Sequence, residues 1–145
     1  MQFKNQVLIG ALIICGIWYV KNNEFSPNID PGGLIDGKGL RVMIVEETAE
    51  RTKLPKEQVA IFGSEEVRAL LNEKCTKEKE GNHPAWWIFD DDSSLENIPK
   101  SWQKAFEKRY QPPPSVMVSN GRKGFSGPLP KDVENFKTLI NKYVK

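Results

Sequence analysis

Residues 115–126 read SVMVSNGRKGFS, and they constrain the architecture more tightly than any other segment of the chain. Two short runs of strand-like composition flank the dipeptide Asn120-Gly121. Asn-Gly favours a two-residue turn in which both residues have a positive φ, and such turns join antiparallel strands. The segment therefore predicts a β-hairpin with its turn at Asn120-Gly121 and its second strand over 122–126.

A helix is predicted on each side of this hairpin along the chain. Upstream, Asn97 and Pro99 mark a helix start, and the prolines at 112–114 end that helix because proline cannot continue the hydrogen-bond ladder. Downstream, a Gly-Pro-Leu-Pro segment at 127–130 leads into a last helix. The upstream helix has an apolar stripe of Trp102, Ala105, Phe106 and Tyr110. The last helix has an apolar face of Val133, Phe136, Ile140, Tyr143 and Val144.

Two further strands are predicted in the first half of the compact region. Residues 40–45, LRVMIV, are apolar on both faces, which is typical of a central strand that is covered on both sides. Residues 85–89, AWWIF, form a second apolar run, which ends at three consecutive aspartates. Between these runs lies a helix with Ser64 as its N-cap. Its apolar face carries Val67, Leu70, Leu71 and Cys75.

The element order is therefore strand, helix, strand, helix, strand, strand, helix. A helix between the first two strands implies a parallel pair with a crossover, whereas the last two strands form the antiparallel hairpin. We predict an α/β domain over 40–145 with a central mixed sheet and helices on both faces. A hydrophobic helix precedes this domain.

That N-terminal helix is predicted from residues 7–20, VLIGALIICGIWYV, which carry no charge. We interpret 1–22 as a membrane anchor or signal segment and 23–39 as a Gly/Pro-rich linker. An uncleaved signal-anchor explains the Trp-Tyr pair at the end of the run and the lack of a small-x-small cleavage site. A cleaved signal and a buried core helix stay open as alternatives. Positive charge at Lys4 and the N-terminus predicts an extracytoplasmic domain, periplasmic or extracellular.

The charge distribution argues against a nucleic-acid partner. The chain has 21 basic and 19 acidic residues, and every acidic residue lies at Glu24 or beyond. Because Lys4 and Lys21 precede Glu24, the soluble part is neutral. Its lysine-rich stretch at 74–80 alternates with glutamates, so it offers no basic stripe for phosphates.

The element order resembles the thioredoxin-like fold, and Pro114, directly before the hairpin strand, resembles that family's cis-proline. The chain is also similar to small, uncharacterised membrane-anchored thioredoxin-like proteins of bacteria and phages. Redox members carry Cys-x-x-Cys just after the first strand, but here residues 46–52 read EETAERT. Cys75 lies on an apolar helix face, where we expect a buried packing residue. The resemblance thus implies a redox-inactive member without disulfide exchange.

The end of the first strand carries the candidate binding residues, which are Glu46, Glu47, Thr48 and Arg51. Ligands bind at the carboxyl ends of strands in open α/β sheets. Together with Pro114, these residues outline the groove that thioredoxin-like proteins use for partners. We predict a membrane-tethered, non-catalytic module that binds a protein or peptide there, with no cofactor and no metal. Solvated charges are the simpler interpretation of this strand end.

Two other functions remain open. The first is a single-cysteine thiol enzyme that uses Cys75, with help from His83. The second is a structural component of the cell envelope. The acidic residues 90–92 lack the glycine and the distant glutamate of a calcium loop, so we expect a solvated loop there.

Overall fold

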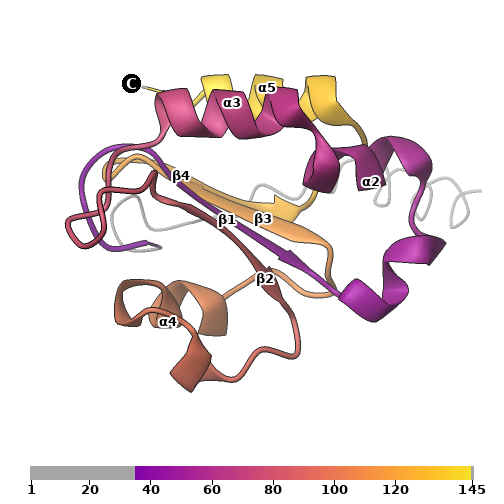
Figure 1. The fold of residues 1–145 in the computed structure, drawn as a ribbon, viewed down its shortest axis with the longest axis horizontal. Helices are drawn as coiled ribbons and strands as arrows, with labels where there is room; N and C mark the ends of the chain where they lie inside the picture. The colour runs from indigo at the N-terminus through magenta and orange to yellow at the C-terminus, as the bar shows by residue number, and fades with distance from the viewer. Residues whose placement is uncertain (1–34, 145) are drawn as a thin grey trace, which may run out of the picture.

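Four strands form one mixed sheet in the computed structural model, which describes residues 35–144 (Figure 1). The strands are β1 (Arg41–Glu46), β2 (Trp86–Asp90), β3 (Ser115–Ser119) and β4 (Gly124–Pro128). Their order across the sheet is β2-β1-β3-β4. The β1/β2 pair is parallel, and the β1/β3 and β3/β4 pairs are antiparallel. The predicted α/β class with a mixed sheet is therefore confirmed.

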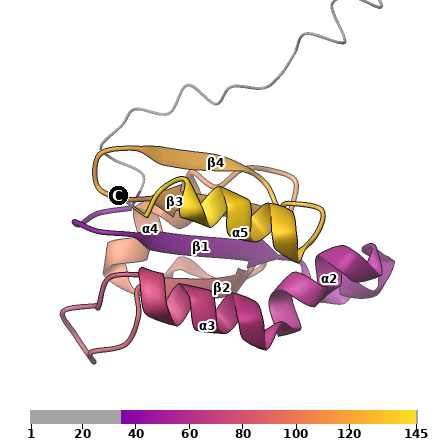
Figure 2. The ribbon, with the colours of Figure 1, turned by 90° about the horizontal axis from the view of Figure 1, so that it is seen from above.

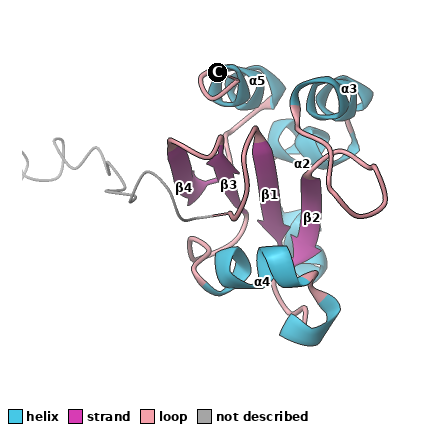
Figure 3. Ribbon diagram, turned by 90° about the vertical axis from the view of Figure 1, so that its left-hand side faces the viewer, coloured by secondary structure: helices cyan, strands magenta, loops and turns pink. Residues whose placement is uncertain are grey.

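Helices cover both faces of this sheet (Figures 1 and 3). One face carries α2 (Lys56–Gly63), α3 (Glu65–Lys74) and α5 (Val133–Asn141). The other face carries α4 (Lys100–Glu107). Figure 2 shows α3 and α5 side by side along the sheet, with α2 extending beyond its end. Two short 3-10 helices, η1 (Thr48–Lys53) and η2 (Leu95–Asn97), lie in the connections.

The central strand β1 separates two hydrophobic cores, because its side chains alternate between the sheet faces. Val42 and Ile44 pack with the buried residues of α2, α3 and α5. Met43 and Val45 pack on the other face with Trp102 and its neighbours from α4. Every residue of β1 is buried. The predicted central strand with cover on both sides is confirmed.

The predicted start of the helix at Ser64 is also confirmed. Ser64 Oγ accepts a hydrogen bond from the Val67 amide at 3.2 Å, which satisfies one of the free N–H groups at the start of α3. Cys75 is the C-cap of this helix, and its side chain is buried in the core. Cys75 therefore adds the end of α3 to the core on the side of α2, α3 and α5.

The hairpin is confirmed, but the predicted two-residue turn is wrong. Ser119 pairs with Gly124, so the loop holds four residues, and only Gly121 of the four has a positive φ. Asn120 explains the longer loop, because its side-chain Oδ1 accepts hydrogen bonds from the Arg122 amide at 3.0 Å and the Lys123 amide at 2.9 Å. Side-chain hydrogen bonding to local amides thus replaces the tighter turn.

The segment that enters β1 packs against the domain. Ile35 is buried in the core on the α4 side, although it lies within the predicted linker 23–39. The predicted anchor at 1–22, with its apolar run at 7–20, lies outside the described residues. Between residues 35 and 144, no helix is both long enough and apolar enough to cross a membrane.

Candidate functional site

The predicted site residues meet at one edge of the sheet, where the parallel strands β1 and β2 end. Glu46 ends β1 and lies opposite Asp90, which ends β2. Pro114 directly precedes β3, whose first residue Ser115 pairs with Val45. Glu47 and η1 follow β1 at the same edge. We call this edge the strand-tip surface, made of Glu46, Glu47, Thr48, Arg51, Asp90, Asp92 and Pro114.

Glu46 and Arg51 form an ion pair at the base of this surface. Arg51 Nε donates to Glu46 Oε2 at 2.7 Å, and Arg51 Nη2 donates to the other carboxylate oxygen. The Glu46 side chain is only 5% exposed, whereas that of Arg51 is 40% exposed. Arg51 also lies over the Phe62 ring, 5.4 Å from its centroid. Glu46 therefore holds Arg51 in place, and Arg51 is the member of the pair that solvent reaches.

Three carboxylates come together at the strand-tip surface. Oxygens of Glu47, Asp90 and Asp92 all lie within 4.8 Å of one another. Burial, followed by the charges of Asp92 and Asp90, raises the pKa of Glu47 above its ordinary value. Hydrogen bonds from Thr48 and from the Asp92 amide lower the pKa of Asp90. Oxygen ligands of this kind suit Mg²⁺ or Ca²⁺, although exposed acidic groups commonly gather without an ion.

Asp91, between the two clustered aspartates, has a structural role. Its Oδ1 accepts from Arg109 Nε at 2.6 Å and from Gln111 Nε2 at 2.9 Å. The Arg109 hydrogen bond is the main cause of a lowered Asp91 pKa. These bonds join the loop after β2 to the segment that leads into the prolines. Pro114 is half-buried, its preceding peptide bond is cis, and its carbonyl accepts from the Leu129 amide at 2.9 Å.

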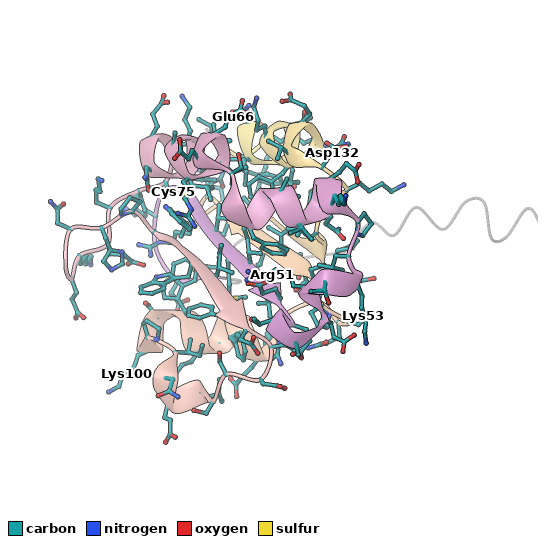
Figure 4. The ribbon with its side chains drawn as sticks, turned by 45° about the vertical axis from the view of Figure 1, so that its right-hand side comes forward. Arg51, Lys53, Glu66, Cys75, Lys100 and Asp132 are labelled. Carbon is teal, nitrogen blue, oxygen red and sulfur yellow. The ribbon has the colours of Figure 1, made fainter. Side chains whose placement is uncertain are left out.

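Cys75 lies away from this surface, near the start of the sheet (Figure 4). Its side chain is 5% exposed. Burial raises its pKa to about 12, against an opposing effect from the Arg41 charge. The thiol is therefore protonated at neutral pH, and a thiol is a poor nucleophile. His83, the suggested helper, is exposed and packs edge-on against Trp87 at 5.3 Å between ring centroids.

The structure brings together every residue that the sequence placed in the groove, and it adds Asp90 and Asp92. The sequence carried a signal for these two aspartates. Both apolar runs end in acidic residues, and their parallel pairing puts these ends at one sheet edge. No protein-family model, curated protein or solved structure gives a significant match to this chain.

Proposed function

We propose that this chain is a non-catalytic, thioredoxin-like binding module that holds a protein or peptide partner at the strand-tip surface. One observation carries the proposal: the ends of β1 and β2 lie beside Pro114 at one edge of the sheet. Open α/β sheets bind their ligands at such edges.

The topology supports the thioredoxin-like part of the proposal. A parallel β1/β2 pair, an antiparallel β3/β4 hairpin and the order β2-β1-β3-β4 agree with the resemblance of the sequence. Pro114 precedes β3 beside the end of β1. The residues after β1, Glu47 to Lys53, include no cysteine. Buried Cys75, with its pKa raised to about 12, does not favour a thiol enzyme.

The charge of the surface indicates the chemistry of the partner. Glu47, Asp90 and Asp92 crowd three carboxylates together, while Arg51 is paired with Glu46. A basic side chain of a partner would relieve this repulsion, because opposite charges at an interface attract and steer association. We therefore propose a partner segment that carries lysine or arginine.

The membrane tether belongs to the same proposal. Residues 7–20 are uncharged and end in Trp18 and Tyr19, which supports an anchor in the membrane interface. Lys4 and the amino terminus favour a cytoplasmic N-terminus. The domain and its partner would then meet outside the cytoplasm.

A selection of random displayed peptides on the full-length chain tests the binding surface. We expect the enriched peptides to carry Lys or Arg and to bind more weakly in higher salt. The double variant Glu47→Gln/Asp92→Asn should weaken their binding about tenfold or more. Glu57→Gln/Glu107→Gln removes two other exposed carboxylates and should leave the affinity unchanged. Equal affinity for both double variants would contradict the proposed surface.

A further inference from the structure

A concave feature lies at the other end of the sheet from the strand-tip surface. It is a cleft of about 810 Å³ on the α4 side, next to the starts of β1 and β2. This volume is in the range of small-molecule sites. The lining residues that matter here are Gly37, Arg41, Glu78, Trp87, Lys100 and Trp102. None of them belongs to the strand-tip surface, which lies at the opposite ends of the same strands.

A buried ion pair forms one wall of the cleft. Arg41 is 7% exposed, and its Nη1 lies 3.1 Å from Glu78 Oε2. The second oxygen of Glu78 accepts from Trp102 Nε1 at 2.8 Å. Both oxygens of this carboxylate are thus hydrogen-bonded. The pair leaves other N–H groups of Arg41 that can donate to a ligand.

Two buried donors of the cleft have no acceptor within residues 35–144. They are Arg41 Nε and Trp87 Nε1. Buried polar atoms are rarely left without a partner, and neither side chain has an acceptor atom. Arg41 and Trp87 also share one sheet face. Arg41 lies two residues before Met43 in β1, so both point to the same face, and Met43 pairs with Trp87. Oxygen atoms from a ligand would satisfy both donors.

The backbone of Gly37 passes close to the Arg41 guanidinium. A Cβ atom at residue 37 would lie 2.6 Å from Arg41 Nε, which is too close for any side chain. Gly37 also has a φ of +121°, a value that glycine tolerates best. Because residue 37 is glycine, no side chain from this position lies against the unpaired Nε–H of Arg41.

The rest of the cleft combines positive charge with a flat apolar wall. Lys100 and the N-terminal turn of α4 lie at the rim, and the N-cap Pro99 makes no side-chain cap hydrogen bond there. The Trp87 ring stacks on Phe89 at 5.7 Å between centroids. The rim also carries Asp36 and Glu80, so the cleft is not broadly basic. This pattern fits one compact anionic group on an apolar body rather than a polyanion.

We propose that the cleft binds a small organic carboxylate with a flat apolar body. The carboxylate oxygens accept from Arg41 Nε and Trp87 Nε1, and the body lies against the Trp87 indole. Neighbouring groups cover both nitrogens. Binding therefore displaces neighbouring groups, such as the Gly37 segment beside Arg41 Nε and the His83 ring, which packs edge-on against Trp87.

Titration of the full-length, ¹⁵N-labelled chain with benzoate tests this site by NMR. The indole N–H signal of Trp87 should move downfield as a hydrogen bond forms. The signal of Trp86 should stay in place, because its Nε1 already donates to Asn72 Oδ1 at 2.9 Å. Benzyl alcohol supplies the same ring without the charge and should bind about tenfold more weakly. Acetate, which lacks the ring, should also bind more weakly than benzoate.

Two matched pairs of variants complete the test. Trp87→Phe keeps an aromatic ring but removes the donor, and it should weaken benzoate binding about threefold to tenfold. Trp86→Phe should not weaken it. Lys100→Gln should weaken binding about threefold, whereas Lys104→Gln, exposed on the same helix and outside the lining, should not.

Three results would overturn the proposal. They are equal affinity for benzoate and benzyl alcohol, unchanged affinity of Trp87→Phe, and a Trp87 signal that does not move with any of the three probes. The double variant Glu47→Gln/Asp92→Asn should bind benzoate normally. Failure of the cleft and failure of the strand-tip surface are therefore separate outcomes.

Discussion

At the scale of single residues, an arginine–glutamate ion pair lies at each end of β1. In each pair, the residue that belongs to β1 is buried. Arg41 begins the strand and pairs with Glu78, and Glu46 ends it and pairs with Arg51. Removal of one partner from such a pair leaves a desolvated charge, which costs more than the pair contributes when intact. Both pairs thus anchor the loops around the central strand.

The Glu46 pair gives a prediction about stability. Arg51→Met removes both donors from a buried carboxylate, so we expect the free energy of unfolding to fall by about 1–3 kcal/mol. Lys53→Met breaks the neighbouring exposed pair with Glu50 and should cost less than about 1 kcal/mol. Urea denaturation of both variants measures the difference. Equal losses would show that Arg51 does not support Glu46.

Cys75 gives a prediction about pH. Its pKa is about 12 in the folded protein against an ordinary value of 9.0, so above pH 9 the unfolded chain loses this proton before the folded one does. Stability should therefore fall between about pH 9 and pH 12, by up to about 1.4 kcal/mol per pH unit from this thiol. From pH 8 to pH 10, the wild type should lose about 1 kcal/mol more than Cys75→Ala in urea denaturation.

Thiol labelling checks the same residue at neutral pH. In a Cys15→Ser background, Cys75 should react slowly with a thiol reagent while the protein is folded and rapidly once urea unfolds it. Fast labelling of the folded protein would instead support the thiol-enzyme alternative. It would also contradict the burial of the side chain.

At the scale of elements, the start of α3 depends on one hydroxyl group. Ser64→Ala removes the acceptor for the Val67 amide, so we expect a loss of about 1 kcal/mol in stability. Ser64→Asp keeps an acceptor at the N-cap and should retain most of that stability. Thermal or urea unfolding of the two variants measures the effect. Similar losses in both would show that the hydroxyl does not cap the helix.

Most elements of this fold were predictable because their signals are local. The apolar run of β1, the Ser64 cap and the helical spacing of Phe136 and Ile140 each lie within a few residues, and all are confirmed. The hairpin turn was predicted wrongly because the Asn120 side chain bonds two loop amides. Dipeptide preference describes the backbone alone and does not include that competition.

The two surfaces were less predictable for a different reason. Glu47 and Asp92 are far apart in the sequence and meet only because β1 and β2 pair in parallel. The cleft needs still more, since Gly37, Trp87 and Lys100 come from three separate segments. Tertiary packing brings such residues together, and a single sequence carries no local signal for it.

At the scale of the whole molecule, the proposed membrane anchor gives a prediction about cell fractionation. The full-length chain should fractionate with membranes, whereas a variant without residues 2–22 should be found in the soluble fraction. Both forms should unfold cooperatively, because the two cores lie within residues 35–144. Equal distribution of the two forms would contradict the anchor. Protease digestion from each side of the membrane would then give the orientation.

The burial of Ile35 has a mechanical consequence for a domain held from its N-terminal side. A pulling force on that side reaches the described residues at Ile35, which is buried in the core on the α4 side. The force then passes into β1. Because β1 is bonded to β2 on one side and to β3 on the other, the load is shared in shear by two rows of hydrogen bonds. An edge strand such as β4 would instead peel away one bond at a time. A load that enters at Ile35 therefore meets an inner strand of the sheet first.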